Sequence, residues 1–178
     1  MKFAYFAALW VGGLVAAEPV VFFIRHGEKP DDRDQTGLSA QGKQRAQCLR
    51  SVFGRGSKYN VGHVMAQAYK PNGKRKRPYD TVEPVAKHLG LTVDTSCDRD
   101  DAQCVKKVVN KYKGPGNILI CWEHKMLAEL AEILGAEKAP DYPRDRFDRI
   151  WVDPFPYSRI SDIVSEKCPG IDRMRNTS

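Results

Sequence analysis

The stretch VVFFIRHGE at residues 20–28 decides the fold, because five apolar residues run directly into Arg25-His26-Gly27. Such a run is typical of a strand buried on both faces of a parallel sheet, although a buried helix segment can share it. Gly27 favours the strand, because glycine permits a sharp turn where the strand ends. Open α/β sheets bind ligands at the carboxyl ends of their strands, so Arg25 and His26 predict an anion site there. Taken alone, the tripeptide fits a loop histidine beside a chance arginine equally well.

A second apolar run, NILICW at residues 117–122, also leads into polar residues, Glu123 and His124. Weaker strand patterns cover three further segments, residues 61–68, 91–95 and 147–152. Helical patterns cover four segments, residues 39–53, 77–90, 102–112 and 126–134. Strands that alternate with helices at these spacings predict an α/β fold built from βαβ units around a mainly parallel sheet.

The predicted sheet collects four polar side chains at one edge: Arg25, His26, Arg77 and His124. Arg77 begins a helix directly after the loop that follows the strand at 61–68, so it lies beyond the carboxyl end of that strand. Arg25, His26 and His124 follow the two apolar strands at the same edge. This convergence is far more specific for an anion site than the tripeptide alone.

The length of 178 residues suits one domain with a substantial core. The first residues combine a basic start, an apolar stretch at residues 3–15 and two alanines, which is the pattern of a secretory signal peptide. We expect cleavage after Ala17, a single domain at residues 18–178 and a secreted protein. The apolar stretch is short for a bilayer span and Glu18 follows the cleavage site at once, so a permanent membrane anchor is the weaker interpretation.

The charge balance favours anionic partners. The formal net charge is +7, and it becomes +6 without residues 1–17, which contain one lysine and no acidic residue. The densest basic cluster, KRKR at residues 74–77, is one short run without interleaved aromatics, and its first three residues suit a solvated surface. Binding of nucleic acid is therefore not expected, and a small phosphorylated substrate or another anion is the expected partner.

Five cysteines leave at least one thiol that cannot pair within the chain. Cys121 lies inside the second apolar run and suits a small buried hydrophobic residue. One pairing consistent with the spacing joins Cys97 to Cys104 in a short loop and Cys48 to Cys168, although other pairings remain open. Such bridges suit an oxidising compartment, and the spacings do not match a zinc site.

Four motifs together resemble the histidine phosphatase superfamily, also called phosphoglycerate mutase-like. They are RHGE at 25–28, LSAQGKQRA at 38–46, Arg77 four residues before Thr81, and ICWEH at 120–124. The match runs from about Val20 to Gly135, and the Cys-Trp-Glu-His version is similar to a small secreted branch found in bacteria and fungi. The resemblance implies a three-layer α/β/α fold with a mainly parallel central sheet.

The resemblance further implies hydrolysis of phosphomonoesters through a covalent phosphohistidine. His26 would attack phosphorus through a neutral ring nitrogen. Arg25 and Arg77 would bind the phosphoryl oxygens, and a protonated His124 would add positive charge. No metal and no cofactor are required, because positioning and electrostatics carry most of phosphoryl transfer.

The leaving group needs a proton, which we expect from a carboxylic acid. Asp98 is the first candidate, with its neighbours Asp100 and Asp101, because their loop follows a strand and rises at the same sheet edge. Glu28 and Glu123 are the alternatives, either as acids or as groups that orient the histidines. The acid-containing motif of the mutases is absent from the sequence, which argues against mutase activity.

The rival hypothesis is a secreted binding or effector protein that retains the phosphate pocket without turnover, because a fold does not by itself imply activity. Substrate specificity is expected from three segments of the chain: residues 29–37, residues 69–76 and the proline-rich tail that begins at residue 139.

Overall fold

The computed structural model describes residues 17–32 and 34–172. The expected signal peptide lies outside these residues except for Ala17, so its cleavage stays a prediction. Among the described residues, no helix has the length and apolar character needed to cross a membrane.

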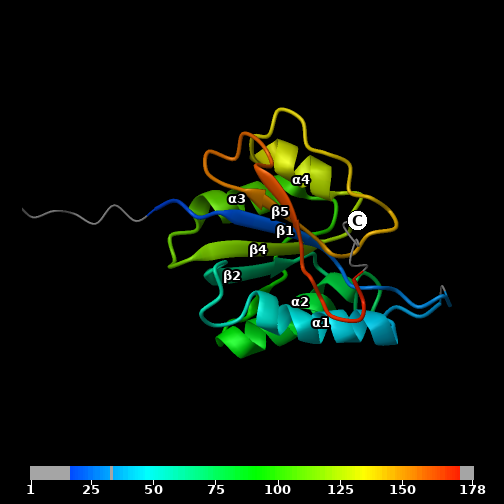
Figure 1. Ribbon diagram of the computed structural model, residues 1–178. Coiled ribbons are helices and arrows are strands. Elements are labelled where there is room, and N and C mark those ends of the chain that lie inside the picture. Colours follow the sequence, from blue (N-terminus) through cyan, green and yellow to red (C-terminus); the bar gives the residue numbers. More distant parts are fainter. Residues whose placement is uncertain (1–16, 33, 173–178) are drawn as a thin grey trace, which may run out of the picture.

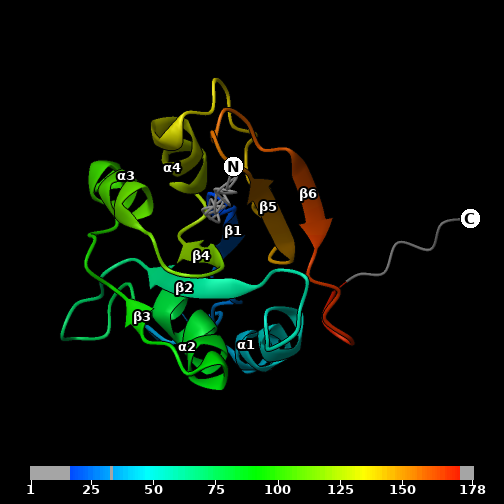
Figure 2. The ribbon, with the colours of Figure 1, turned by 90° about the vertical axis from the view of Figure 1, so that its left-hand side faces the viewer.

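Six strands form one central sheet with helices on both faces, and Figures 1 and 2 show the two helical layers on either side of it. The elements follow the chain in this order: β1 (Val21–Arg25), α1 (Ala40–Val52), β2 (Val61–Ala66), α2 (Arg77–Leu89), β3 (Val93–Asp94), α3 (Ala102–Lys111), β4 (Asn117–Trp122), α4 (Leu127–Leu134), β5 (Arg149–Asp153) and β6 (Asp162–Ser165). The strand order is β3-β2-β4-β1-β5-β6. The predicted three-layer α/β/α architecture is therefore confirmed.

The sheet is parallel over four strands and antiparallel at one side. β1 runs parallel to β4, β4 to β2 and β2 to β3, whereas β5 is antiparallel to β1 and β6 to β5. β5 corresponds to the strand predicted at 147–152. No strand was predicted at β6, because its residues are exposed or half-buried and form no apolar run. β3 is shorter than predicted, because it pairs only with β2 and is an edge strand.

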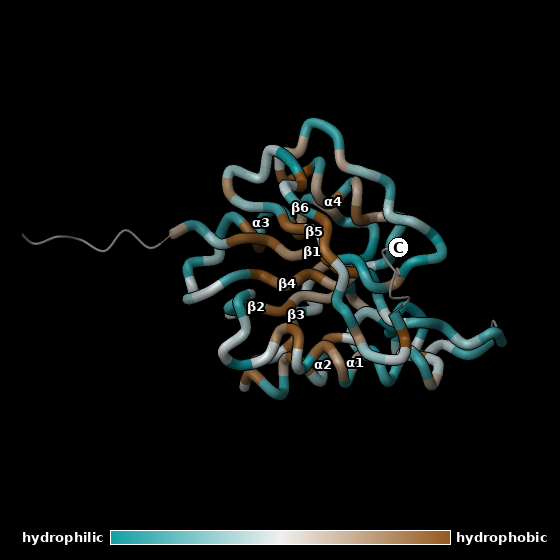
Figure 3. The backbone as a smooth tube through the Cα atoms, viewed as in Figure 1, coloured by the Kyte–Doolittle hydropathy of each residue, from teal (hydrophilic) through white to brown (hydrophobic). Residues whose placement is uncertain are grey.

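The two central strands send alternate side chains to opposite faces. Val21 and Phe23 of β1 join the core under α3 and α4, whereas Phe22 and Ile24 join the core over α1 and α2. All residues of β1 are buried, as expected for a strand with a neighbour on each side and a helical layer on each face. Figure 3 shows the result as a band of apolar strands that ends in hydrophilic loops.

The start of α1 and the end of α2 are both set by the residue that flanks the helix. Ser39 precedes α1, and its side-chain oxygen accepts a hydrogen bond from the Gly42 amide, which satisfies one free N–H of the first turn. Gly90 ends α2 with φ of 74°, a left-handed conformation that glycine adopts without a steric cost. These ends set the positions of the loops that surround the site.

Both expected disulfides are present, Cys48–Cys168 and Cys97–Cys104, and Cys121 is a buried free thiol. The long-range bridge connects α1 to the segment after β6. The C-terminal part of the chain is thereby held against the helix that follows the RHGE loop.

Candidate active site

The carboxyl ends of β1 and β4 lie side by side. The register pairs Arg25 with Trp122, and the His26 amide donates to the Trp122 carbonyl at 3.2 Å. His26 follows β1 directly, and His124 lies two residues beyond the end of β4. The two strand ends and the loops that extend from them lie on the right of Figure 1.

His26 has a defined tautomer. Its Nδ1 lies 2.7 Å from the Gly27 carbonyl oxygen, which can only accept, so Nδ1 carries the proton and Nε2 carries a lone pair. The side chain is buried, with 7% of the residue exposed. Burial, together with the charges of Arg25, Arg77 and His124, lowers the pKa of His26 to about 3. The imidazole is therefore neutral at pH 7, as a nitrogen nucleophile must be.

The turn that carries His26 is held from two sides. The Gly27 amide donates to the Thr81 hydroxyl at 2.9 Å, and this hydroxyl donates to the Arg77 carbonyl at 2.7 Å. A side chain at Gly42 would place its Cβ 2.4 Å from the Glu28 carbonyl oxygen, so only glycine lets α1 lie against the turn. The spacing of Arg77 and Thr81 thus has a structural reason, because one turn of α2 supplies both groups.

Arg25 is buried against a distant loop. Its Nη1 donates to the carbonyls of Arg144 at 2.8 Å and Arg146 at 2.7 Å. Its guanidinium carbon lies 3.7 Å from the centre of the Phe147 ring. Only 4% of Arg25 is exposed, and its Nε has no hydrogen-bond partner in the described part of the chain. Burial lowers the pKa of Arg25, so the site keeps a positive charge that is poorly solvated.

Arg77 occupies the first position of α2 and contacts the loop after β1. Its Nε donates to the Gly37 carbonyl at 3.0 Å, and its Nη2 donates to the Gln35 carbonyl at 2.8 Å. Burial lowers the pKa of Arg77 as well. Each of the two arginines therefore also fixes one of the loops that border the site.

His124 lines the same cavity as Arg25 and Arg77. Its Nδ1 is buried without a partner among the described residues. Burial and the charge of Arg25 lower the pKa of His124, whereas Glu123 opposes the shift. This direction differs from the protonated imidazole that the sequence predicts. The negative charge of a bound anion would favour the protonated form.

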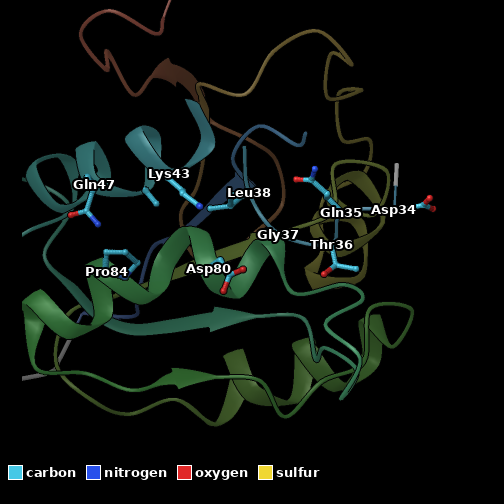
Figure 4. Close-up of a pocket in the computed structure, with 10 residues that line it drawn as sticks. Asp34, Gln35, Thr36, Gly37, Leu38, Lys43, Gln47, Asp80 and Pro84 are labelled. Atoms are coloured by element: carbon cyan, nitrogen blue, oxygen red, sulfur yellow. The ribbon is translucent and has the colours of Figure 1, made fainter. Parts of the chain in front are cut away.

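A cavity of about 1130 Å³ opens above these residues and is bordered by the loops at 29–31 and 144–147 and by the first turn of α1. A neighbouring hollow of about 640 Å³ lies behind the loop at 34–38, and Figure 4 shows the residues that line it. Gln35, Leu38 and Lys43 border both spaces. The cavity that contains Arg25, Arg77 and His124 is therefore the candidate active site.

Comparison with solved structures supports the fold. The structure of the protein histidine phosphatase SixA complexed with tungstate aligns with a TM-score of 0.61 and 17% identity, over 83% of this chain and 97% of that chain. SixA from Agrobacterium tumefaciens aligns with a TM-score of 0.56 and 11% identity, over 83% of this chain and 98% of that chain. The chain has the fold of histidine phosphatases. No family model matches the sequence, and no curated protein matches it.

Glu28 and Glu123, the alternative acids, are both paired with arginines. Both carboxylate oxygens of Glu28 accept hydrogen bonds from Arg45, at 2.7 to 3.1 Å. Glu123 accepts from Arg99 Nη1 at 2.7 Å and does not line the cavity. Among the described residues neither carboxylate hydrogen-bonds to a histidine, so an orienting role toward the histidines stays a prediction.

The three aspartates predicted after β3 lie away from the cavity. Asp98 is exposed, Asp100 binds Arg99 and Arg75, and Asp101 caps α3 by accepting from the Cys104 amide at 2.9 Å. The order of the strands argues against these aspartates as the proton donor. β3 is the outermost strand, and β2 and β4 separate it from β1, so its loop rises too far from His26.

Asp31 is the carboxylate that the sequence reasoning missed. It lines the cavity, it is exposed, and it forms no ion pair or side-chain hydrogen bond with the described residues. Asp31 lies only five residues after His26, which could have identified it as a candidate acid. The sequence analysis expected its loop to determine only substrate specificity. Among the described cavity residues, Asp31 is the acid that no cation neutralises.

Arg45 is the centre of a buried charge cluster beside the site. Its guanidinium binds Glu28, Glu166 and Asp172, and only 2% of its side chain is exposed. These three carboxylates raise the pKa of Arg45 against the effect of burial. Burial raises the pKa of Glu166 to about 8, and the charge of Asp172 acts in the same direction. Arg45 lies in the LSAQGKQRA motif, but no local pattern predicts that Glu28, Glu166 and Asp172 surround it.

The Cys48–Cys168 disulfide holds this cluster together. Cys48 lies three residues after Arg45 on α1, and the Cys168 amide donates to Asp172 at 2.6 Å. Glu166, Cys168 and Asp172 are close enough to share a metal ion, but the thiol is consumed in the bridge and both carboxylates bind Arg45. The cluster is therefore suited to a structural role and not to metal binding.

Proposed function

We propose that the protein hydrolyses phosphomonoesters through a phosphohistidine on His26, without a metal ion. The observation that carries the proposal is the neutral, buried His26, whose Nδ1 proton is fixed by the Gly27 carbonyl and whose chain neighbour Arg25 lines a cavity together with Arg77 and His124. A phosphate-binding role agrees with the fold, because a SixA structure of the same fold contains tungstate. We propose hydrolysis and not mutase transfer, because the acid motif of the mutases is absent.

In the first step, the lone pair on His26 Nε2 forms a bond to phosphorus as the bond from phosphorus to the ester oxygen breaks. The departing oxygen takes a proton from the Asp31 carboxylic acid, so the alcohol leaves neutral. In the second step, Asp31 accepts a proton from water as the water oxygen bonds to phosphorus and the bond from phosphorus to His26 Nε2 breaks, which returns the lone pair to Nε2. Inorganic phosphate then leaves, and His26 is again neutral.

Arg25, Arg77 and His124 stabilise the charge of the transferred group. The arginines can direct N–H donors at phosphoryl oxygens. Arg25 Nε is buried without a partner among the described residues. His124 gains a proton when phosphoryl charge lies beside it and then donates to the third oxygen. Loss of one such donor typically reduces the rate about a hundredfold or more.

The test is the hydrolysis of 4-nitrophenyl phosphate combined with trapping of acid-labile phosphate on the protein. Wild-type protein should release phosphate and become labelled, whereas His26→Ala should do neither. His88→Ala is the matched control, because His88 is exposed on α2 and should not change either readout. Tight binding of phosphate or vanadate without any turnover would instead support the secreted binding protein.

We also propose that the protein is secreted. The two disulfides suit an oxidising compartment, and the N-terminal sequence has the pattern of a signal peptide. Sequencing of the N-terminus of protein recovered from culture medium should begin at Glu18. Recovery of the full chain from the cell interior alone would contradict the proposal.

A further inference from the structure

We propose that Gln67 is a positioning residue for His124 and Arg77, on which it acts through the backbone of the two loops that carry them. The inference rests on the proposed phosphatase function and adds a residue that would act on two of its phosphate-binding groups. Gln67 directly follows β2, which lies beside β4 in the sheet. Only 2% of Gln67 is exposed, so its side-chain amide must find its hydrogen-bond partners within the protein.

The side-chain amide of Gln67 joins the two loops. Its Oε1 accepts a hydrogen bond from the Glu123 amide at 3.1 Å, and its Nε2 donates to the Arg75 carbonyl at 3.3 Å. Glu123 immediately precedes His124. Arg75 lies two residues before Arg77. A backbone N–H can only donate and a carbonyl can only accept, so the two partners fix the orientation of the amide. One buried side chain therefore connects the loop after β4 to the loop before α2.

The two loops lead into helices that do not fix their own starts. Among the described helices, α2 and α4 begin without a side-chain hydrogen bond from the preceding residue, which is Lys76 for α2 and Met126 for α4. Arg75 also has a φ of 67°, a left-handed conformation that is unfavourable for a residue with a side chain. The positions of these loops therefore depend on contacts from outside the helices, and Gln67 supplies one to each loop.

His124 depends on this backbone contact more than Arg77 does. The Arg77 guanidinium binds two carbonyls of the loop after β1, whereas Nδ1 of His124 is buried without a partner among the described residues. The residue before His124 is held at both its backbone and its side chain. Its amide binds Gln67, and its carboxylate accepts from Arg99 Nη1 at 2.7 Å. Loss of the contact to Gln67 would therefore shift the imidazole of His124 relative to the phosphoryl group.

Asn117 makes the same pair of contacts at the opposite end of β4. Its Oδ1 accepts from the Val20 amide at 2.9 Å, and its Nδ2 donates to the Tyr59 carbonyl at 2.8 Å. Replacement of Gln67 by methionine, or of Asn117 by leucine, removes one accepted and one donated hydrogen bond to the backbone. Both changes should destabilise the fold, but only the change at Gln67 lies beside the site. Asn117→Leu is therefore the matched control for Gln67→Met.

The experiment measures the affinity for inorganic phosphate by calorimetry and the titration of His124 by NMR in the absence of phosphate. Gln67→Met should bind phosphate about tenfold or more weakly than the wild type, because its donors are no longer directed at the same oxygens. Burial and the charge of Arg25 lower the pKa of His124 in the wild type. In Gln67→Met this pKa should rise towards its ordinary value of 6.5, as the released loop exposes the imidazole to water. Asn117→Leu should keep the wild-type values of both.

A Gln67→Met protein with the phosphate affinity and the His124 titration of Asn117→Leu would overturn the inference, because Gln67 would then support only the stability of the fold. If Gln67→Met does not fold, Gln67→Asn applies the same test, since its amide is shorter by one methylene group and should not reach both partners. The titration of His124 requires neither turnover nor bound phosphate. Failure of the positioning role is therefore distinguishable from failure of the phosphatase function, which the His26 experiment tests.

Discussion

The Arg45 guanidinium binds the Glu28 carboxylate through Nη2 at 2.7 Å and through Nε at 3.1 Å to both oxygens. This contact fixes α1 to the loop that begins two residues after His26. The same guanidinium also binds Glu166 and Asp172, so the C-terminal segment supports the turn that positions the proposed nucleophile.

Replacement of Arg45 by methionine should lower the free energy of unfolding by roughly 3–5 kcal/mol, because it leaves three buried carboxylates without their cation. Urea unfolding measures the change. Arg50→Met, an exposed position on the same helix, is the control and should lie within about 0.5 kcal/mol of the wild type. An Arg45→Met protein as stable as this control would show that the cluster does not hold the loop.

The two disulfides should contribute unequally to stability. Cys48 and Cys168 are 120 residues apart, whereas Cys97 and Cys104 are seven apart. A disulfide stabilises the fold by restricting the unfolded chain, and a longer loop gives a larger effect. The expected contribution to the free energy of unfolding is about 5 kcal/mol for the long bridge and about 2 kcal/mol for the short one. Urea unfolding of Cys48→Ala/Cys168→Ala and of Cys97→Ala/Cys104→Ala compares them. A larger loss for the short bridge would contradict the expectation.

Acidification should destabilise the protein through His26. The pKa of His26 is about 3 in the fold and about 6.5 in the unfolded chain, so between these values the unfolded chain binds the extra proton. Stability should therefore fall as the pH decreases from 6.5 towards 3, by up to about 1.4 kcal/mol per pH unit for this group.

Melting temperatures of wild-type and His26→Asn protein between pH 7 and pH 4 measure this contribution. The variant should lose less stability than the wild type over that range. His88→Asn removes an exposed histidine of α2 and should keep the wild-type slope. Identical slopes for all three proteins would show that His26 is not held neutral by the fold.

The sequence predicted those features that depend on a pattern within a single segment of the chain. The apolar runs of β1 and β4 predicted two buried strands, because a strand covered on both faces has no polar positions. The helical pattern at residues 77–90 predicted that Arg77 begins a helix beyond the carboxyl end of the strand before it. Each of these features depends on residues within one or two elements of the chain.

Other features depend on contacts that no local pattern encodes. Arg25 is oriented by the carbonyls of Arg144 and Arg146. Every residue has a backbone carbonyl, so such contacts cannot be predicted from residue types. Asp98 was expected at the site because its loop follows a strand. The sequence does not reveal the lateral order of the strands, in which β2 and β4 separate β3 from β1.

Asp31→Asn should separate substrates by their leaving groups. An alkoxide needs a proton to leave, whereas 4-nitrophenolate is stable as an anion, so loss of the acid affects the first far more. We expect the rate for an alkyl phosphate to fall about a hundredfold or more and the rate for 4-nitrophenyl phosphate to fall much less. Asp98→Asn is the matched control and should leave the ratio of the two rates at its wild-type value. Equal losses for the two substrates in Asp31→Asn, or a changed ratio in Asp98→Asn, would show that Asp31 is not the proton donor.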